Sequence, residues 1–395
     1  MNVLQINTAD TKGGAGKVAY SLKNELAKMG HSSTLLVSRK YSQDNDVKLI
    51  RPDSNFRRRA LKKLTYYLAN DLDLFPAEHI LKMPEFKNAD IIHCHNLHTN
   101  YFNLRTLEKI SKLKPVVWTF HDMWPITAHC AHSFDGALNQ NGFFTCPSLD
   151  IYPPIAWHNE KYLENKKSKI YTKSNFHIVT PSKWLADKVG QSLLKDKLLT
   201  IIYNGIDTNI FKSLPKEQSR QELNLPQDKK IVLIVAKHGQ SNPWKGGNHA
   251  QEIMNSYKNN SDVYFVDLGG DENKKEGNIE TVSYINSRET LVKYYSAADV
   301  LLYPSLADNC PLVVLEALAS ALPVVSFDTG GIPELVEHKK TGYIAKYENT
   351  EDLKNGLEFT LGLGNINPIN KFNVEKMAAD YLSLYNDLIK NYNKI

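Results

Sequence analysis

The sequence lacks the features of a membrane-spanning or secreted protein. A helix that crosses a bilayer needs about 18 or more consecutive apolar residues, and the sequence contains no such run. The opening residues MNVLQINTAD also lack the basic and apolar stretches of a secretory signal peptide. The 4 cysteines lie far apart, which favours a reducing compartment over a disulfide framework. These absences predict a cytoplasmic protein, either free or on the inner face of a membrane.

A strong excess of one charge is also missing. The 48 basic and 43 acidic residues leave a net charge of +5, which is mild for this length and does not suggest nucleic acid as a partner. Hydrophobic residues make up 42% of the chain and charged residues 23%, a globular composition. Because 395 residues exceed what a single core usually organises, we expect two domains of about 200 residues each.

Short apolar runs alternate with helix-length segments along the whole chain. Each run is continuously apolar, as in strands that are buried on both faces of a parallel sheet. In the first half the predicted strands are VLQIN (3–7), TLLVS (34–38), DIIHCH (90–95), PVVWTF (115–120), HIVTP (177–181) and LTIIYN (199–204). In the second half they are IVLIVA (231–236), VYFVDL (263–268), DVLLYP (299–304) and PVVSFD (323–328), with a further strand near 279–283. This rhythm predicts doubly wound α/β domains.

The alternation of strands and helices begins once in each half of the chain, which predicts a domain boundary between the halves. A polar, proline-containing segment separates the two series of strands, and we place the boundary near residue 205. The first domain then covers residues 1–205 and the second covers 206–373. A last helix, at about 374–391, carries apolar residues at helical spacing. Such a face needs a surface to cover, so we expect residues 374–395 to dock back on the first domain.

A second helix is predicted at about residues 311–321, shortly after the strand that ends at Tyr303. Asp308 and Asn309 precede Pro311, which suits the first turn, and their side chains can cap the helix. The free amides of such a helix start favour phosphate. Glu316, one and a half turns further, can accept hydrogen bonds from a ribose. The other interpretation of Glu316 is a solvent-exposed position on the helix.

These motifs together resemble the retaining glycosyltransferases of family 4, in the branch that makes colanic-acid-type surface polysaccharides. Asp308 and Glu316 resemble the E-x7-E signature with Asp in place of the first Glu, and DTGGIPEL follows. Further motifs in the family order are TFHDMWP (119–125), VTPSKWL (179–185), YNGIDTNIF (203–211) and WKGG (244–247). The resemblance implies the GT-B fold, two Rossmann-like domains with an interdomain cleft. It also implies retaining transfer of a hexose-type sugar from a nucleotide diphosphate sugar to a glycan or lipid-linked acceptor.

The resemblance also implies roles for individual residues. Glu316 matches the residue that binds the donor ribose, and Asp308 matches the residue that contacts the transferred sugar. The amides near Leu312 and Val313 would face the pyrophosphate. His121, which follows the strand PVVWTF, matches a histidine that contacts the donor sugar, and Asp122 beside it can orient the ring.

Two lysines are candidates for stabilising the leaving nucleotide diphosphate. A fixed cation stabilises charge that grows in the transition state, and Lys245 of the WKGG motif occupies the family position for it. Lys237 stands nearest to the position of a second cation, although the spacing of eight residues is longer than usual. A solvated loop lysine is the alternative interpretation of Lys245. Tyr284 and Asn286, which follow the strand near 279–283, are predicted to contact the base.

The glycine loop after the first strand has two interpretations. In a glycosyltransferase, Gly13 and Gly14 would border the donor phosphates and the acceptor, because glycine allows close approach of the backbone. The stretch 12–18 also resembles the phosphate loop of a P-loop ATPase. That loop needs Ser or Thr after its final lysine to hold Mg²⁺, and Val18 stands there. A catalytically silent, sugar-binding GT-B protein is the third function to test.

Histidines gather in two places. We expect His95, Asn96 and His98, from the stretch HCHNLH, to line the acceptor side. The loop region 124–160 follows a strand, where α/β ligands usually bind. An alternative interpretation of this loop is a zinc site formed by His129, Cys130, His132 and Cys146. Sugar hydroxyls suit cleft histidines equally well, and the family resemblance implies neither a metal nor another cofactor.

A basic segment runs from Arg51 to Leu68. Phe56, Leu61, Leu64 and Leu68 have helical spacing, with arginines and lysines around them. A basic amphipathic helix of this kind can lie on an anionic bilayer. The alternative is a helix packed on its own domain with solvated charges.

Overall fold

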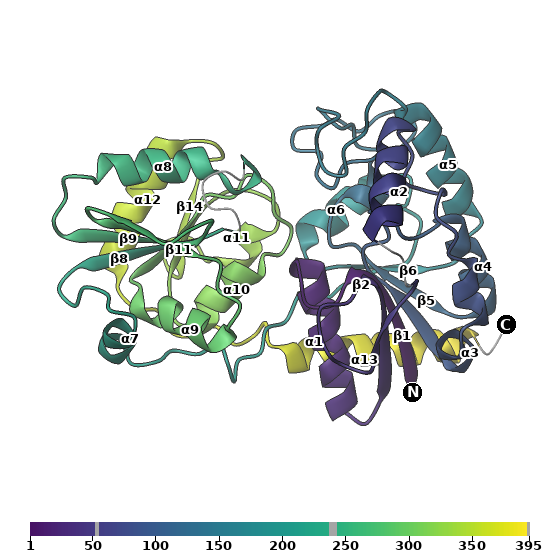
Figure 1. The fold of residues 1–395 in the computed structure, drawn as a ribbon, viewed down its shortest axis with the longest axis horizontal. Helices are drawn as coiled ribbons and strands as arrows, with labels where there is room; N and C mark the ends of the chain where they lie inside the picture. Colours follow the sequence, from purple (N-terminus) through teal and green to yellow (C-terminus); the bar gives the residue numbers. More distant parts are fainter. Residues whose placement is uncertain (52–54, 237–242, 393–395) are drawn as a thin grey trace. The chain divides into compact units, whose positions relative to one another are not determined.

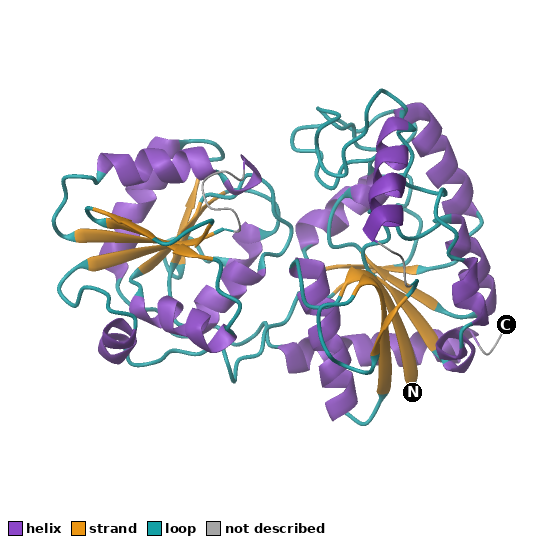
Figure 2. Cartoon of the chain, viewed as in Figure 1, coloured by secondary structure: helices purple, strands orange, loops and turns teal. Residues whose placement is uncertain are grey.

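The computed structural model describes residues 1–51, 55–236 and 243–392. The chain divides into two compact units. Unit 1 contains Met1–Asn204 and Val374–Ile395, and unit 2 contains Gly205–Asn373. In each unit a central sheet (orange in Figure 2) carries helices on both faces, which is the three-layer arrangement of a doubly wound α/β fold.

Unit 1 is built on a parallel sheet with the strand order β3-β2-β1-β4-β5-β6-β7 among its described residues. The register pairs Gln5 of β1 with Leu35 on one side and with His93 on the other. The strands are β1 (Asn2–Ala9), β2 (Ser32–Arg39), β3 (Val47–Leu49), β4 (Ile91–Cys94), β5 (Val116–Thr119), β6 (His177–Thr180) and β7 (Leu199–Ile201). Parallel pairing places the carboxyl ends of these strands at one edge, where the loops with the candidate residues of this unit begin.

The helices of unit 1 are α1 (Gly14–Lys28), α2 (Asn55–Tyr67), α3 (Pro84–Asn88), α4 (Arg105–Leu113), α5 (Glu160–Thr172), α6 (Lys183–Gln191) and α13 (Val374–Tyr392), with 3₁₀ turns η1 (Glu78–Lys82) and η2 (Trp124–Ile126). Most of the longer ones, namely α1, α4, α5, α6 and α13, bury apolar residues, whereas the described side chains of α2 are largely exposed. Helix α13 lies beside α1 (yellow in Figure 1) and buries Met377, Tyr381 and Tyr385 at the spacing of one helix face. Trp118 of β5 is among the largest fully buried side chains of the core.

Unit 2 repeats the architecture with the strand order β10-β11-β9-β8-β12-β13-β14, in which β10 runs antiparallel to β11. Its strands are β8 (Lys230–Val235), β9 (Val263–Gly270), β10 (Lys274–Glu276), β11 (Ile279–Ser283), β12 (Val300–Tyr303), β13 (Val324–Phe327) and β14 (Gly342–Ala345). Its helices are α7 (Lys216–Glu222), α8 (Gly247–Ser256), α9 (Arg288–Ala297), α10 (Leu312–Ala319), α11 (Ile332–Leu335) and α12 (Thr350–Leu363), with the 3₁₀ turn η4 (Pro243–Lys245). Phe265 and Phe327 are fully buried in its core.

The predicted doubly wound fold is confirmed, and each strand predicted from a continuous apolar run is present. Three short strands, β3, β10 and β14, were not predicted. Strands β3 and β10 have the sequences VKL and KKE, which lack an apolar run. The predicted helix at 311–321 is shorter than expected, since α10 covers Leu312–Ala319 and Ala321 has a left-handed φ of 62°. None of the helices in the described ranges is long and apolar enough to cross a membrane.

Candidate active site

Four side chains of unit 2 meet at the carboxyl ends of β8 and β12. The Asp308 carboxylate accepts hydrogen bonds on Oδ2 from the Tyr303 hydroxyl at 2.6 Å and from Ser305 Oγ at 2.7 Å. The Lys245 ammonium forms an ion pair with the same oxygen. It also lies 3.0 Å from the Tyr303 hydroxyl. Asp308 and Tyr303 therefore hold the Lys245 ammonium in one place, and Ser305 helps to orient the Asp308 carboxylate.

Two glycines allow the loops that carry this cluster to approach. Gly246 follows Lys245 with φ of 63°, and a β-carbon there would lie 1.8 Å from the carbonyl oxygen of Pro304. Gly330 has φ of 56°, and a β-carbon there would lie 1.5 Å from the carbonyl oxygen of Asp308. Any side chain would push the loops apart. The glycines of the WKGG and DTGGIPEL motifs thus serve the geometry of the lysine–aspartate pair.

Burial and charge act in opposite directions on this pair. Burial alone would lower the pKa of the Lys245 ammonium, but the Asp308 carboxylate reverses the effect and leaves that pKa above its ordinary value. Burial likewise works to raise the pKa of Asp308, and the charge of Lys245 leaves it below its ordinary value. Both groups are therefore charged at neutral pH, and the Asp308 carboxylate orients the Lys245 ammonium.

Glu316 belongs to a second set of side chains. It is buried on α10, and its Oε2 accepts a hydrogen bond of 2.8 Å from the hydroxyl of Tyr295 on α9. The alternative of a solvent-exposed helix position is therefore wrong. Burial and the Glu316 carboxylate raise the pKa of Tyr295, and Tyr303 adds to the effect, so the two sets are electrostatic neighbours.

The predicted capping of α10 by the Asp308 carboxylate is wrong. Pro311 is the N-cap residue, and the helix has no side-chain cap hydrogen bond among the described residues. The carboxylate of Asp308 is held instead by the lysine cluster. Leu312 and Val313 open the helix and are half-buried, so their amides belong to the first turn, where backbone donors have no partner within the helix.

The remaining predicted residues of unit 2 are more scattered. Tyr284 and Asn286 are exposed and lie between β11 and α9. Ser287, next to them, caps α9 by accepting a hydrogen bond from the amide of Thr290. Lys237 lies outside the described residues.

In unit 1 the four predicted histidine and asparagine positions come together in one narrow pocket. The residues that line it come from the ends of β4 and β5 and from the start of the long loop. They are His95, Asn96, Leu97, His98, Trp118, Thr119, Phe120, His121, Asp122, Trp124 and Pro125. His95 Nδ1 lies 2.9 Å from His121 Nε2.

Asp122 orients a different histidine from the one predicted. Its Oδ2 lies 2.8 Å from His98 Nε2, and its Oδ1 accepts a hydrogen bond from the amide of Trp124. Burial works to raise the pKa of Asp122, but His98 and these hydrogen bonds leave it below the ordinary value. The carboxylate therefore fixes His98 and the entrance of the long loop.

The glycine loop lies at the start of α1. Gly13 is the N-cap residue with φ of 76°, and Gly14 is the first helical residue. Both are exposed, and a β-carbon at either position would meet no atom within 4 Å. Val18, where a P-loop needs a hydroxyl, is buried in the core, which agrees with the glycosyltransferase interpretation of this loop.

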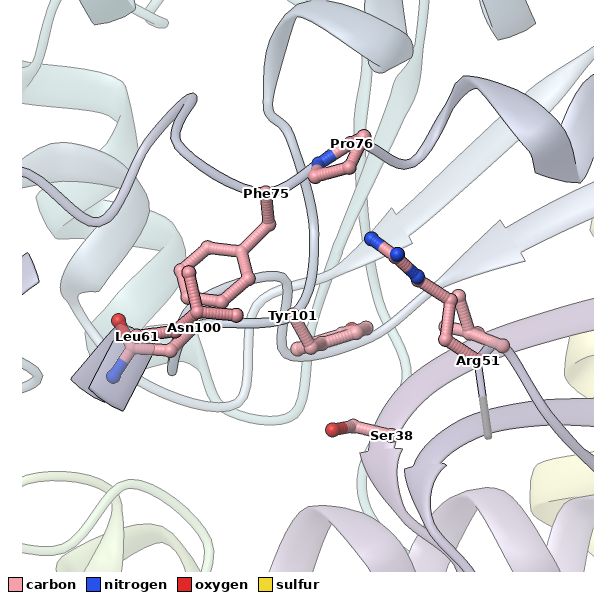
Figure 3. A pocket seen from close by; sticks show the side chains of 8 residues that line it. Ser38, Arg51, Leu61, Phe75, Pro76, Asn100 and Tyr101 are labelled. Atoms are coloured by element: carbon pink, nitrogen blue, oxygen red, sulfur yellow. The ribbon is translucent and has the colours of Figure 1, made fainter. Parts of the chain in front are cut away.

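A hollow of unit 1 lies beside α2, at the ends of β2 and β3 (Figure 3). Its polar lining comes from Ser38, Arg51 and Asn100, and its apolar lining includes Leu61 and Phe75. Asn100 and the preceding residue have left-handed φ values of 66° and 76°. Non-glycine residues in this region are uncommon and cluster at functional sites.

The long loop contains a disulfide, Cys130–Cys146, which the cysteine count did not predict. His129 Nδ1 lies 3.0 Å from the carbonyl oxygen of Pro153. Within the described part of the chain, no three His, Cys, Asp or Glu side chains converge as metal ligands would. The cysteines of the zinc alternative are joined to each other instead.

The sequence did not reveal several residues that hold these sites. Tyr295 and Tyr303 position the two carboxylates, and Gln5 contacts His95. Lys167 is fully buried on α5, and its ammonium donates to the carbonyl oxygens of Trp124 and Thr127. Of these residues, only Tyr303 could have been identified from the sequence, because it ends the predicted strand just before the motif that contains Asp308 and Glu316.

The buried His93 and His95 and the half-buried His121 should make unit 1 sensitive to acid. Burial lowers the pKa of His93 and His95 well below the ordinary value and that of His121 to about 4. Below about pH 6.5 the unfolded chain therefore binds more protons than the folded chain. The stability that depends on the neutral histidines is complete above that pH and is lost as the pH falls. We expect the free energy of unfolding, measured in urea, to drop by up to about 4 kcal/mol per pH unit.

His95→Gln should reduce the slope of this free energy against pH, whereas substitution of the exposed His158 should leave the slope unchanged. Equal slopes in both variants would contradict the assignment.

Two Rossmann-like units, a fixed lysine paired with the aspartate that precedes α10, and a buried glutamate on that helix are the features of a nucleotide-sugar-dependent glycosyltransferase of the GT-B fold. Comparison with family models agrees with this class. The model described as Glycosyltransferase Family 4 matches residues 12–210, and the model described as Glycosyl transferases group 1 matches residues 215–365. The chain belongs to glycosyltransferase family 4 and is a retaining enzyme.

Individual relatives are distant but cover most of the chain. A protein of Escherichia coli (strain K12) named as a glycosyl transferase of colanic acid biosynthesis, WcaC, is 25% identical over 359 residues, 85% of each chain. The alpha-monoglucosyldiacylglycerol synthase of Acholeplasma laidlawii is 25% identical and covers 95% of this chain and 93% of its own. The crystal structure of HepE from Anabaena in complex with UDP-glucose has a TM-score of 0.59 at 14% identity, over 100% of this chain and 99% of its own. The structural likeness supports the fold.

Proposed function

We propose that the enzyme transfers a hexose from a UDP-sugar to a glycan or lipid-linked acceptor in the synthesis of a bacterial surface polysaccharide. The observation that carries the proposal is the ion pair of Lys245 with Asp308, which shortly precedes α10 in the chain, together with Glu316 buried on the same helix. The name of the relative WcaC supports a polysaccharide product. The UDP-glucose complex of HepE supports a uridine donor.

In this proposal the first turn of α10 and Lys245 hold the diphosphate. Free amides at a helix start bind phosphate oxygens, and the helix dipole favours their charge. Lys245 adds a full positive charge whose position is set by Asp308 and Tyr303 before a donor arrives. Because the groups are already oriented, they stabilise the leaving diphosphate without reorganisation in the transition state.

The two carboxylates bind different parts of the donor. Glu316, oriented by Tyr295, accepts hydrogen bonds from the ribose hydroxyls. The three hydrogen-bond and ion-pair contacts described above all reach Oδ2 of Asp308, and Oδ1 is the oxygen we assign to a hydroxyl of the transferred sugar. The sugar carbon becomes oxocarbenium-like as its bond to phosphate breaks. For unit 1 by itself we assign His121 to the donor sugar, Gly13 and Gly14 to the donor phosphates and the acceptor, and His95, Asn96 and His98 to the acceptor.

A donor screen tests the proposed function. Thermal shift with UDP-, GDP-, ADP- and TDP-glucose should show the largest stabilisation with UDP-glucose, because ligands that bind only the folded state raise its melting temperature. Hydrolysis of the same donors then separates an enzyme from a silent binding protein. Stabilisation by ATP with Mg²⁺, lost in Lys17→Ala, would instead favour the P-loop function. No stabilisation by any sugar nucleotide would contradict the proposal.

We further propose that α2 contacts an anionic membrane surface, where a lipid-linked acceptor would be found. Part of the helix packs on its own unit through Thr65, but Leu64, Tyr67 and Leu68 are 46%, 66% and 45% exposed. Trp157, half exposed, donates a hydrogen bond to the Tyr67 carbonyl and extends this apolar surface. Exposed aromatic and leucine side chains beside basic ones suit the interface of an anionic bilayer. The hollow lined by Arg51 lies next to this surface and is our candidate for the acceptor.

Removing charge from α2 should weaken binding to vesicles. The exposed basic side chains Arg59, Lys62 and Lys63 each contribute about 1 kcal/mol near an anionic surface. The triple glutamine variant should therefore bind phosphatidylglycerol vesicles at least about tenfold more weakly in a sedimentation assay. A control variant with Lys87, Lys109 and Lys112 replaced by glutamine removes the same charge from α3 and α4. Equal binding by both variants would show that α2 is an ordinary solvated helix.

A further inference from the structure

The hydroxyl of Tyr303 lies between the two charged groups of unit 2 that form the lysine–aspartate pair. It is 2.6 Å from Oδ2 of Asp308 and 3.0 Å from Nζ of Lys245. Tyr303 is the last residue of β12 and is 3% exposed, so the packed core holds its ring. The position of this hydroxyl is therefore set by the sheet, whereas Lys245 and Asp308 are carried by loops that follow β8 and β12.

The hydrogen bonds of the Tyr303 hydroxyl have a fixed direction. An ammonium can only donate and an ionised carboxylate can only accept. The hydroxyl must therefore accept a hydrogen bond from Lys245 and donate its single proton to Asp308. It keeps that proton at neutral pH, because burial and the Asp308 carboxylate raise the pKa of Tyr303 and the opposing effect of Lys245 is smaller. The three groups thus have one arrangement of protons.

This arrangement orients the whole Lys245 ammonium. Of its three N–H groups, one is directed at Oδ2 of Asp308 and one at the Tyr303 hydroxyl, and the third meets no acceptor in the described part of the chain. Because two N–H directions are fixed, the third is fixed as well. Without the Tyr303 hydroxyl the ammonium would be held by one partner and could rotate about that contact.

The carboxylate of the pair is also stabilised by hydroxyl groups. Oδ2 of Asp308 accepts hydrogen bonds from Tyr303 and, at 2.7 Å, from Ser305 Oγ. Hydrogen bonds to a carboxylate favour its charged form, so Asp308 stays ionised with less dependence on the ammonium. The positive charge of Lys245 is correspondingly more available to a second anion.

We propose that Tyr303 is a positioning residue that directs the third N–H of Lys245 at an oxygen of the leaving diphosphate and stabilises the Asp308 carboxylate behind it. The proposal rests on the proposed function, in which Lys245 binds the diphosphate. Tyr303 itself does not touch the donor in this account. A cation that is oriented in advance stabilises growing negative charge without reorganisation, so the hydroxyl should matter more for the transition state than for binding of the intact donor.

The position of the ammonium can be observed without turnover. In ¹H–¹⁵N correlation spectra of the full chain labelled at lysine, the Lys245 ammonium is the signal that disappears in Lys245→Arg. We expect this signal to shift or broaden in Tyr303→Phe and to stay unchanged in Tyr343→Phe. The control removes a hydroxyl of the same unit that lies 2.9 Å from another carboxylate oxygen, Oδ1 of Asp352. An unchanged signal in Tyr303→Phe would overturn the positioning role whatever the enzyme transfers.

Kinetics separate positioning from a purely structural role. With UDP-glucose as the probe, Tyr303→Phe should lower kcat for hydrolysis at least about tenfold. The Kd of the slow donor UDP-2-deoxy-2-fluoroglucose should stay within about threefold, since the charge on its diphosphate has not yet grown. Tyr343→Phe should leave both constants unchanged. Added to Lys245→Ala, Tyr303→Phe should cause no further loss, because the hydroxyl acts through the lysine.

The proposal and the proposed function fail separately. Additive losses in Tyr303→Phe and Lys245→Ala, or an unchanged kcat in Tyr303→Phe, would overturn the role of Tyr303 while leaving the donor in place. Absence of turnover with UDP-glucose in the wild type would count against the proposed donor. The spectra would then decide, since saturating UDP should shift the Lys245 signal of the wild type, and bound UDP without such a shift would contradict the contact with the diphosphate.

Discussion

Lys245→Ala should lower the turnover of the donor by about 10²-fold or more, which is about 2.7 kcal/mol of transition-state stabilisation. The physical reason is the charge that grows on the diphosphate as the sugar–phosphate bond breaks. The Lys245 side chain is 26% exposed, and its ammonium is ionised and held by Asp308 and Tyr303. The positive charge is therefore in place before the donor binds. The loss should appear in kcat more than in the Kd of UDP, measured by single-turnover hydrolysis and by calorimetry.

Two controls isolate the charge of Lys245 from its structural role. Lys245→Arg keeps a cation that can pair with Asp308, whereas Lys245→Ala removes it. If the catalytic effect is due to the charge, Lys245→Arg should retain clearly more activity than Lys245→Ala. Lys340→Ala removes an exposed lysine of the same unit that pairs with Glu337 and should leave the rate unchanged. A change of less than twofold in Lys245→Ala would rule out its role.

Glu316→Gln should weaken the binding of UDP by about 10- to 100-fold, because a hydrogen bond to a charged group contributes about 1.5–3 kcal/mol. Glutamine keeps the shape of the side chain and an oxygen for the hydroxyl of Tyr295, so the fold around α10 should survive. The glutamate binds the ribose in our account. The loss should therefore be absent when the probe is 2′,3′-dideoxyuridine diphosphate, which lacks both ribose hydroxyls.

Comparing UDP with 2′,3′-dideoxyuridine diphosphate makes the assignment of Glu316 specific. The loss of binding free energy caused by Glu316→Gln and the loss caused by removing the ribose hydroxyls should not add, since both changes remove the same interaction. Tyr295→Phe, which removes only the hydrogen bond that orients the carboxylate, should cause a smaller loss. Additive losses would place Glu316 away from the ribose.

The fold was predictable because its signals are strong and local. Buried parallel strands appear as continuous apolar runs such as IVLIV and VVWT, and α13 shows its apolar face at helical spacing. The strands that were missed are short, and KKE of β10 is an exposed edge strand that carries no hydrophobic signal. The left-handed Ala321 shortens α10 in a way that propensity does not anticipate.

The site was predictable as a set of residues but less as a set of contacts. Asp308 was expected to cap α10, yet it pairs with Lys245, because Gly330 and Gly246 bring their loops together. Asp122 contacts His98 and not the adjacent His121. Which partner each carboxylate contacts depends on distances between residues that are far apart in the sequence and are brought together by the fold. The tyrosines that orient the carboxylates were missed for the same reason.

Hydrogen exchange on the full chain tests the central claim most directly. If the diphosphate binds the uncapped start of α10, then saturating UDP should slow amide exchange across residues 305–317, which contain Asp308, Leu312, Val313 and Glu316. Protection in this segment that needs about 10- to 100-fold more UDP in Glu316→Gln, with Lys340→Ala behaving as the wild type, is the result we predict. Tight UDP binding that protects other segments and leaves residues 305–317 unchanged would contradict it.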